Sequence, residues 1–288
     1  MSRIAYVNGR YLPHHAAEVH IEDRGYQFAD GVYEVAAASG GRLVDGAAHF
    51  DRLERSLGEL DMAMPMSRAA LRLVVGETLR RNAVRDGIVY LQVTRGVAPR
   101  NHGFPKNVRP ALVVTARRLR LPSDAESVPG IKVISQPDIR WGRCDIKSIA
   151  LLPNVLAMQR ALEADAFESW MIDGKGYVTE ASSANAWIVD RDGRVTTRPK
   201  SNAILGGITR ESVIRLAEGA GIELVERPFT IDEARAAREA FITSTTSFVK
   251  PVVQIDESVI GNGEPGAITR RLLGLYLAYA RNEPEACV

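Results

Sequence analysis

The sequence predicts an α+β fold with two domains, and two observations carry this prediction. Segments with the apolar pattern of strands are mixed with segments of helical period, without the regular alternation of strand and helix found in a doubly wound sheet. Residues 119–130 are rich in proline, serine and charge and show no period, as is typical of a linker. We therefore expect an N-terminal domain at residues 1–118 and a C-terminal domain at residues 131–288.

The expected elements of the first domain follow from turn residues and apolar spacing. Asn8-Gly9 suits the positive-φ positions of a tight turn, so the segments on either side of it, residues 4–7 and 10–13, should form a hairpin. Apolar and β-branched runs predict further strands at 31–38, 41–45, 88–96 and 111–118. Apolar residues at helical spacing, with Ser67 as a suitable cap, predict helices at 47–61 and 67–81.

The second domain is expected to mix the two kinds of element again. Runs rich in valine, isoleucine, threonine and aromatic residues predict strands at 131–136, 169–173, 177–182, 185–190, 222–229 and 240–244. Helical spacing predicts helices at 153–165, 209–220 and 267–281. The irregular order of these elements favours α+β for this domain as well.

Composition and charge exclude several kinds of partner. Hydrophobic residues make up 45% of the 288-residue chain and charged residues 25%, which is ordinary for a soluble globular protein. The formal net charge of +2 offers no support for binding to nucleic acid or to a membrane surface. Cys144 and Cys287 form neither a disulfide framework nor a metal-binding motif, and no signal peptide or membrane-spanning run is recognisable. We therefore expect a cytoplasmic protein without a bound metal.

Lys147 is a candidate nucleophile. It lies between the polar segment DIRWGRCD and the apolar segment SIALLPNV. A lysine in such a place usually lays its stem on the core and keeps its ammonium group in water. Burial under the apolar segment, together with the nearby cations Arg140 and Arg143, would instead favour the neutral amine that Schiff-base chemistry needs. Such chemistry requires a carbonyl compound, and therefore a binding site for it elsewhere in the chain.

Two segments could bind the phosphate of such a compound. Gly206 and Gly207 precede a predicted helix, so the amides of Ile208 and Thr209 would lie at a helix N-terminus, which attracts anions. The segment TSTTS, residues 243–247, follows a predicted strand and offers hydroxyl groups and amides to the same anion. A plain capped helix and an ordinary polar turn are the alternative interpretations.

Three further features have the chemistry that a phosphorylated pyridine and an amino acid would need. Arg52, three residues before Arg55 on the first predicted helix, could bind a phosphate through its guanidinium fork or could form a surface salt bridge. Glu180 could keep a pyridine nitrogen protonated or could be a surface glutamate. Arg100 and His102, two residues apart, would point the same way in an extended loop and would suit a carboxylate, or could belong to an ordinary polar loop.

Taken in order, these motifs resemble the fold-type IV family of pyridoxal-phosphate enzymes. The resemblance lies in EDRGYQFADGVYEV, HxxRLxxS, TRGxxPRNHxFP, DIRWxRCDIKS, TEASSAN, LGGITR and TSTTS, which extend from about residue 20 to about residue 256. Within that family the chain is most similar to the D-amino-acid transaminases. The resemblance implies a small N-terminal α/β sandwich, a larger C-terminal pseudo-barrel domain, and a homodimer in which the arginine–histidine loop reaches the active site of the neighbouring subunit.

The resemblance also implies a role for each candidate. Lys147 would form the Schiff base with pyridoxal 5'-phosphate and carry the proton between the substrate α-carbon and the cofactor. Glu180 would face the pyridine nitrogen, Leu205 would pack on the ring and Arg140 would lie near the 3'-oxygen. The residues implied to bind the phosphate are Arg52, Ile208, Thr209, Ser244 and Thr245. Those implied to bind the substrate carboxylate are Tyr33, Arg100 and His102.

The activity expected from this resemblance is transamination between D-amino acids such as D-alanine and 2-oxo acids such as pyruvate or 2-oxoglutarate, in a ping-pong reaction. A branched-chain L-amino-acid transaminase, an (R)-amine transaminase and an aminodeoxychorismate lyase are alternatives on the same scaffold. Arg100 and His102 argue against a simple amine, which would leave both cations unpaired. An alternative of another class is a non-catalytic binding protein that uses the basic segment TARRLRLP.

Overall fold

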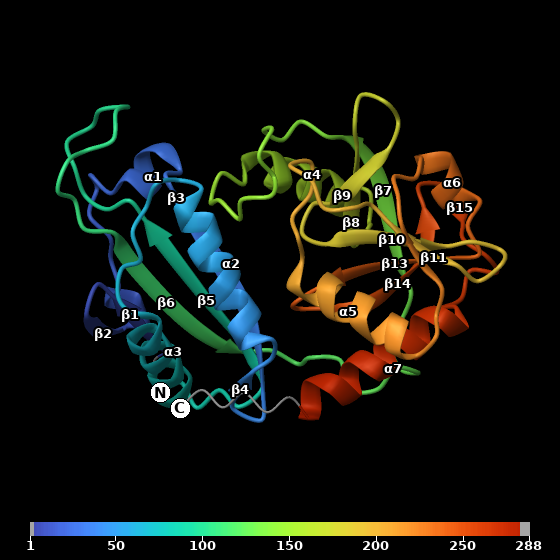
Figure 1. The fold of residues 1–288 in the computed structure, drawn as a ribbon, viewed down its shortest axis with the longest axis horizontal. Helices are drawn as coiled ribbons and strands as arrows, with labels where there is room; N and C mark the ends of the chain where they lie inside the picture. Colours follow the sequence, from blue (N-terminus) through green and yellow to red (C-terminus); the bar gives the residue numbers. More distant parts are fainter. Residues whose placement is uncertain (1–2, 283–288) are drawn as a thin grey trace. The chain divides into compact units, whose positions relative to one another are not determined.

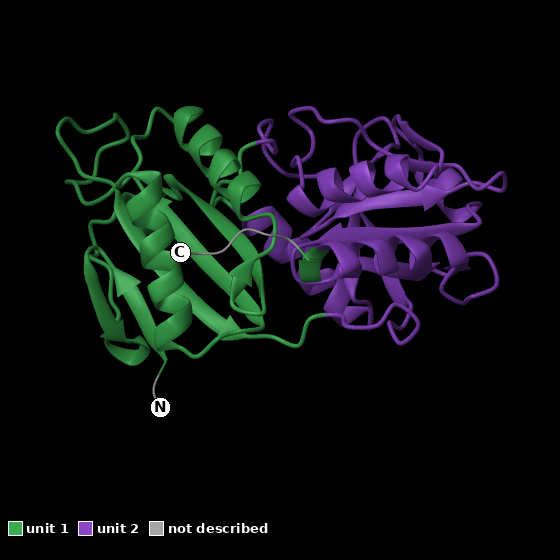
Figure 2. Ribbon diagram, turned by 60° about the horizontal axis from the view of Figure 1, so that its bottom comes forward, with its two compact units in different colours: residues 1–121, 146–150, 280–288 green, residues 122–145, 151–279 purple. Residues whose placement is uncertain are grey.

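Two β-sheets form the frame of the protein, one in each of two units (Figure 1). The structure, a computed structural model, describes residues 3–282. Figure 2 colours the units by their residues, which are 1–121, 146–150 and 280–288 for the first unit and 122–145 and 151–279 for the second. Each unit has a hydrophobic core of its own.

The first unit is built on a six-stranded antiparallel sheet in the order β2-β1-β6-β5-β3-β4. Its strands are β1 (Ile4–Val7), β2 (Arg10–Pro13), β3 (Gly31–Ser39), β4 (Arg42–Leu43), β5 (Gly87–Thr94) and β6 (Ala111–Arg118). Its helices are the 3-10 helix η1 (His14–Ala16) and the α-helices α1 (Arg24–Phe28), α2 (Gly46–Gly58) and α3 (Arg68–Arg81). Asn8 and Gly9 have φ angles of 45° and 93°, as the predicted hairpin turn requires.

Helices α2 and α3 pack on this sheet, and the apolar residues between the helices and the sheet form the hydrophobic core of the unit. Leu53 and Leu57 of α2 and Leu71 and Val75 of α3 are buried in one cluster with strand residues such as Val32. Their spacing of four residues places each pair on one helix face, which is the pattern that the sequence shows. Removing these apolar surfaces from water is the main source of stability for the unit.

A short segment, residues 146–150, pairs with the beginning of β3. The amide of Tyr33 donates a hydrogen bond to the carbonyl of Lys147 (3.0 Å), and the amide of Ile149 donates one to the carbonyl of Gly31 (3.1 Å). These two bonds fix the backbone at the Lys147 carbonyl and two residues further on, at the Ile149 amide. The candidate nucleophile therefore belongs to the first unit.

The second unit is built on a nine-stranded mixed sheet in the order β12-β11-β10-β13-β14-β7-β8-β9, with β15 on β14. Its strands are β7 (Ile131–Pro137), β8 (Glu168–Ile172), β9 (Val178–Ala181), β10 (Asn185–Val189), β11 (Val195–Thr197), β12 (Leu224–Glu226), β13 (Glu239–Ser244), β14 (Phe248–Ile255) and β15 (Ser258–Val259). Its helices are α4 (Leu152–Glu163), α5 (Ile208–Gly219), α6 (Ile231–Arg235) and α7 (Ala267–Asn282), of which the residues from 280 on belong to the first unit. None of the helices within residues 3–282 has the length and apolar character needed to cross a membrane.

The predicted α+β fold is confirmed, since both sheets carry helices without regular strand–helix alternation. The sequence missed several short elements, which are η1, α1, β11, α6 and β15. It also missed β14, a central strand that contains Pro251. The predicted strand at 222–229 is too long, because only Leu224–Glu226 pair with β11.

Candidate active site

Lys147 lies against an aromatic ring of the first unit. Its Nζ atom is 4.2 Å from the centroid of the Tyr33 ring, a distance at which the ring face attracts an ammonium group. Lys147 is half-buried, and its neighbours Ile146 and Ser148 are buried. The sequence predicts burial of the apolar run that follows, but Leu152 in that run is exposed. The backbone pairing with β3, which includes Ile149 at the start of that run, and the Tyr33 ring therefore hold Lys147, rather than burial of the whole run.

Tyr33 is itself supported from the neighbouring strand β5. The rings of Tyr33 and Tyr90 stack with their centroids 5.7 Å apart and an interplanar angle of 28°. The Tyr90 hydroxyl donates a hydrogen bond to Oε1 of Gln92 (2.7 Å). Burial raises the pKa of Tyr90 to about 12, so its hydroxyl stays protonated and remains a donor. The Tyr33 ring beneath Lys147 is therefore held by the Tyr90 ring, and the Tyr90 ring is held by its hydrogen bond to Gln92.

Arg52 is paired with Glu34, the residue that follows Tyr33 in β3. Its Nε and Nη2 atoms donate to the two carboxylate oxygens of Glu34 at 2.7 Å and 2.8 Å, and Nδ1 of His49 lies 2.8 Å from Oε2. Burial raises the pKa of Glu34, but Arg52 and His49 outweigh burial and lower it to about 2. Because successive strand residues point to opposite faces, Arg52 meets the helix-covered face of β3 and Lys147 meets the other. A guanidinium carries five N–H donors, so its pairing with Glu34 is compatible with a second anion.

Arg100 and His102 lie in the long loop between β5 and β6, which projects from the first unit (Figure 1). Both side chains are exposed. Cζ of Arg100 is 4.9 Å from the centroid of the Phe28 ring, and the His102 ring lies 5.3 Å from the same ring. The structure therefore brings these two residues together on one aromatic side chain of α1.

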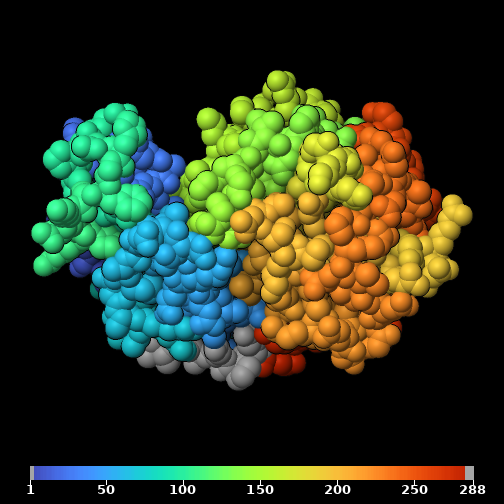
Figure 3. All heavy atoms as spheres, turned by 45° about the horizontal axis from the view of Figure 1, so that its top comes forward, coloured from blue at the N-terminus to red at the C-terminus, as the bar shows by residue number. Residues whose placement is uncertain are grey.

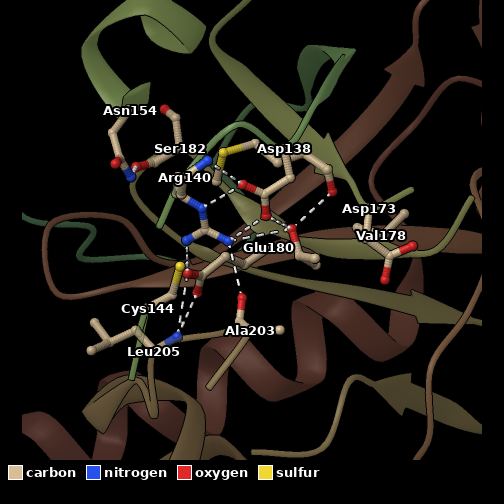
Figure 4. Close-up of polar contacts among 12 residues, drawn as sticks. Asp138, Arg140, Cys144, Asn154, Asp173, Val178, Glu180, Ser182, Ala203 and Leu205 are labelled. Carbon is tan, nitrogen blue, oxygen red and sulfur yellow. Dashed lines mark hydrogen bonds and ion pairs between the residues drawn. The ribbon is translucent and has the colours of Figure 1, made fainter. Parts of the chain in front are cut away.

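Arg140 is the centre of a buried charge cluster in the second unit (Figure 4). It donates from Nη2 to Oδ2 of Asp138 (2.7 Å) and to the carbonyl of Ala203 (3.0 Å), and it forms an ion pair with Glu180. Burial lowers the pKa of Arg140, but the two carboxylates outweigh burial and raise it above its ordinary value. The arginine thus remains charged and ties together three segments that are distant in sequence.

Glu180, near the end of β9, is held by donors from three directions. Besides Arg140, the Nδ2 atom of Asn185 donates to Oε2 (2.9 Å) and the amide of Leu205 donates to the same oxygen (3.1 Å). The residue is buried. These bonds fix the orientation of the carboxylate within the second unit.

The N-terminus of α5 has the features of an anion site. Gly207 occupies the cap position, and no side chain within residues 3–282 caps the first amides of this helix. A Cβ atom at Gly207 would lie 2.0 Å from Oδ1 of Asn185, so the close approach of the backbone requires glycine. The amides of Ile208 and Thr209 thus begin a helix whose positive end can attract a phosphate.

A second group of hydroxyls ends β13, against which α5 packs. Ser244 is the last residue of this strand, and Thr245 begins the turn that leads into β14. The amide of Ser247 donates to Oγ of Ser244 (3.2 Å), which closes the turn. A cavity of about 550 Å³ lies beside this turn and is lined by Ser183, Ser244, Thr246 and Ser247 together with apolar residues that include Phe167.

The predicted site residues are divided between the two units. The first unit contains Tyr33, Arg52, Arg100, His102 and Lys147, and the second contains Arg140, Glu180, Leu205, Ile208, Thr209, Ser244 and Thr245. Within the first unit, Lys147 meets Tyr33, and Arg100 and His102 share a ring. Within the second unit, the Glu180 carboxylate accepts bonds from Arg140 and Leu205. Each unit thus assembles its own part of the predicted constellation.

The sequence did not single out three residues that hold these side chains. Asp138 lies two residues before Arg140, and this acid–base spacing could have pointed to it. Glu34 and Asn185 have partners that are distant in sequence, and no local pattern shows such contacts.

The sequence was also compared with known proteins. Residues 31–255 match the family described as Amino-transferase class IV. This chain belongs to the class IV aminotransferases. A D-alanine aminotransferase from Bacillus licheniformis is 42% identical to it, covering 92% of this chain and 93% of that protein. One from Staphylococcus haemolyticus is 40% identical, covering 93% and 94%. The solved structure of a T.th. branched-chain amino acid aminotransferase with pyridoxamine 5'-phosphate is 27% identical, with a TM-score of 0.89, and covers 99% of this chain and 96% of that chain.

Class IV aminotransferases use pyridoxal 5'-phosphate, and the residues of this aminotransferase fit that group. The glycine-preceded start of α5 and the hydroxyls at the end of β13 suit a phosphate. The buried Glu180 suits a protonated pyridine nitrogen. Lys147, half-buried over Tyr33, has the primary amine that suits an aldehyde.

Proposed function

We propose that this aminotransferase transfers the amino group of D-amino acids such as D-alanine to 2-oxo acids such as pyruvate or 2-oxoglutarate. The observation that carries the choice of substrate is the pair of cationic side chains, Arg100 and His102, that share the Phe28 ring. Two adjacent donors of this kind suit an α-carboxylate, and Tyr33 is proposed to complete the carboxylate site. The identity of about 40% with D-alanine aminotransferases over most of the chain supports the same choice.

Each group of proposed cofactor-binding residues is assigned to one part of the cofactor. Arg52, Ile208, Thr209, Ser244 and Thr245 are proposed to bind the phosphate. Glu180 is proposed to hold a proton at the pyridine nitrogen, Arg140 to lie near the 3'-oxygen and Leu205 to pack on the ring. When bound, pyridoxal 5'-phosphate supplies an aldehyde for the substrate amine and a ring that accepts the electron pair of the α-carbon.

Lys147 is proposed to have two tasks, both at its Nζ atom. It is the amine that binds the cofactor aldehyde between turnovers, and it moves the proton at the substrate α-carbon during each half-reaction. The hydrogen bonds between residues 146–150 and β3 hold its backbone in place for both tasks. The ping-pong order follows, because the amino group taken from the donor must be held in the site until the first oxo acid has left and the acceptor has bound.

A homodimer is part of the proposal. Helix α4 exposes Leu152, Val155, Leu156 and Leu162, which are between 50% and 69% accessible. Apolar side chains of this size that share an exposed helix are typical of a surface that a partner covers. We propose that a second copy of the chain covers it, and that the enzyme is cytoplasmic, as the cysteine content predicts.

One donor panel tests the proposed reaction. Purified enzyme with pyridoxal 5'-phosphate and 2-oxoglutarate should convert D-alanine, and should convert L-leucine and (R)-1-phenylethylamine far more slowly. Lys147→Ala should abolish turnover and the visible absorbance of the lysine-bound cofactor. Lys175→Ala, at an exposed turn, is the matched control and should change neither. Preference for L-leucine, or turnover by Lys147→Ala, would contradict the proposal.

The branched-chain alternative has one observation in its favour, the structural likeness to a branched-chain amino acid aminotransferase. That likeness extends over nearly the whole chain, but its identity of 27% is well below the 42% of the D-alanine relative. The same panel separates the two, because the branched-chain reaction requires L-leucine as a donor.

A further inference from the structure

The motif EDRGYQFADG contains a buried arginine, Arg24, that contacts the loop carrying Arg100 and His102. The Arg24 side chain is 3% exposed. Its Nη1 atom donates to the carbonyl of Asn101 (2.5 Å), and its Nη2 atom lies 3.4 Å from the carbonyl of His102. The guanidinium therefore contacts the backbone of the loop at the two residues that follow Arg100.

Asp30 connects this contact to the base of the same loop. Its Oδ2 atom accepts hydrogen bonds from Nε of Arg24 (2.7 Å) and from Nε of Arg95 (2.8 Å). Arg95, the first residue after β5, also donates to the carbonyl of Leu60 (2.7 Å), and its Cζ atom is 3.7 Å from the centroid of the Phe104 ring. Burial raises the pKa of Asp30, but the two arginines outweigh burial and lower it, so the bridge is charged at neutral pH.

The same short helix supplies the ring on which the two cationic side chains lie. Phe28 is on α1 with Arg24, whose Cζ atom is 4.9 Å from the centroid of the Phe28 ring. Arg100 is 4.9 Å from this centroid, and the His102 ring is 5.3 Å from it. One helix thus orients the backbone of the loop through Arg24 and its side chains through Phe28. Figure 3 shows how far this loop, in green, projects from the blue residues beside it.

We propose that Arg24 is a positioning residue for substrate-carboxylate binding, acting through the carbonyls of Asn101 and His102 and braced by Asp30. Burying an arginine is costly unless its bonds are satisfied. Here two of those bonds are made to a projecting loop, whose ends alone would leave its tip free to move. Fixing the loop before the ligand arrives removes an ordering cost from binding. This inference rests on the proposed function, because it assigns the carboxylate to Arg100 and His102.

Two substitutions at Arg24 test the inference on the holoenzyme. Arg24→Lys keeps the charge and loses the fork, and Arg24→Met keeps the length and loses every donor. Both should raise KM for D-alanine about tenfold while kcat changes less than about threefold, because the lost bonds act on binding of the carboxylate. Propionate, which is D-alanine without its amino group, should bind with a Kd raised by a similar factor. Its binding is followed by the visible absorbance of the cofactor and needs no turnover.

Arg68 provides a matched control in the same unit. It also donates to an aspartate, Asp51, and to a backbone carbonyl, that of Ala47, and it lies over the Phe50 ring, but it does not contact the loop. Arg68→Met should lower the melting temperature without changing KM or the Kd of propionate. Asp30→Asn is the second variant and should weaken propionate binding in the same direction as Arg24→Met.

Each outcome decides the inference. Weaker binding of D-alanine and propionate in the Arg24 and Asp30 variants, with the Arg68 variant unchanged, supports it. Variants that lose thermal stability but bind propionate as the wild type does would overturn it. If the wild type binds propionate but does not use D-alanine, the proposed function fails. The comparison of propionate Kd between the wild type and the Arg24 variants still tests the role of Arg24. A wild type that binds no propionate overturns the role of Arg24.

Discussion

Buried charges at the candidate site are arranged in matched sets. Glu34 faces Arg52 and His49 in the first unit, and Arg140 faces Asp138 and Glu180 in the second. Removing one member of such a set leaves its partner buried without compensation, which costs more than the intact pair contributes. Single substitutions at these residues should therefore affect folding and cofactor binding together.

Glu34→Gln is the clearest case. The change leaves the Arg52 side chain, 10% exposed, without its carboxylate and should lower the free energy of unfolding by about 3 kcal/mol at neutral pH. The folded pKa of Glu34 is about 2, below its ordinary value of 4.5, so the stabilisation is fully present above 4.5 and is lost as the pH falls toward 2. The difference between wild type and variant should therefore shrink across that range.

Urea unfolding at neutral pH and at several pH values below 4.5 measures this difference. Glu77→Gln is the control, because Glu77 pairs with Arg80 and Arg81 in solvent and its loss should matter little. A difference between wild type and Glu34→Gln that stays constant down to about pH 2 would contradict the assignment of the stabilisation to ionised Glu34.

The sequence points to candidate residues for chemistry more readily than to the residues that hold them. Lys147, Glu180 and Arg100 were singled out because several motifs in one order resemble a known family, and their roles stay predictions. The pairing of Glu34 with Arg52 could not be predicted, because it depends on which face of β3 meets α2. Only the alignment of strand and helix in three dimensions decides that contact.

At the scale of secondary-structure elements, the N-termini of two helices, α5 and α7, have features that suit a negatively charged group. Helix α5 begins after Gly207, at a backbone position that a side chain would block. Helix α7 begins at a buried carboxylate, because Glu239 accepts hydrogen bonds from the amides of Ile268 and Thr269 and from the Thr269 hydroxyl. At α7 the glycine before the helix makes room for the carboxylate that the helix end meets, and at α5 it makes room for the Asn185 side chain.

Two glycine substitutions at α7 should have opposite effects. A Cβ atom at Gly266 would lie 1.9 Å from Cδ of Glu239, and Glu239 cannot move without breaking its bonds to the start of α7. Gly266→Ala should therefore lower the free energy of unfolding by about 2 kcal/mol. At Gly274, inside the helix, the nearest atom would be 4.0 Å away, so Gly274→Ala should raise it by up to about 1 kcal/mol.

Thermal and urea unfolding of the two variants check this pair of expectations. Gly274→Ala serves as the control, since it adds the same methyl group to the same helix. Equal effects of the two substitutions would show that Glu239 does not occupy the space beside Gly266.

The elements that the sequence missed lack a readable period or contain a residue that argues against them. Helix α1 has five residues, too few to show a helical repeat. Strand β14 contains Pro251, which usually argues against a central strand. The structure places Pro251 opposite Phe241 of β13, one residue before the pairing of β14 with β7 begins at Val252. Pro251 therefore lies outside the ladder with β7, where a missing N–H donor is tolerated.

At the scale of the whole molecule, the chain order and the units do not coincide. Residues 146–150 belong with residues 1–121, although segments of the second unit precede and follow them. The sequence could not show this, because the bond between the Tyr33 amide and the Lys147 carbonyl joins residues distant in sequence. We propose residues 119–130 as the linker between the units.

The proposed homodimer gives the prediction that concerns the whole molecule. Leu152 and Leu156 of α4 are 69% and 50% exposed and lie one helical turn apart. If a second copy covers them, each should contribute about 2 kcal/mol to association. The double variant Leu152→Glu and Leu156→Glu should then be monomeric at concentrations where the wild type is a dimer, as measured by size-exclusion chromatography with light scattering.

Leu73→Glu, at a leucine of α3 that is 56% exposed, should leave the dimer intact. A dimeric double variant, or dissociation caused by Leu73→Glu, would place the interface elsewhere than α4. The donor panel on the monomeric variant would then show whether one chain converts D-alanine without its partner. The proposed homodimer predicts that it does not, because the loop with Arg100 and His102 is expected to reach the active site of the neighbouring subunit.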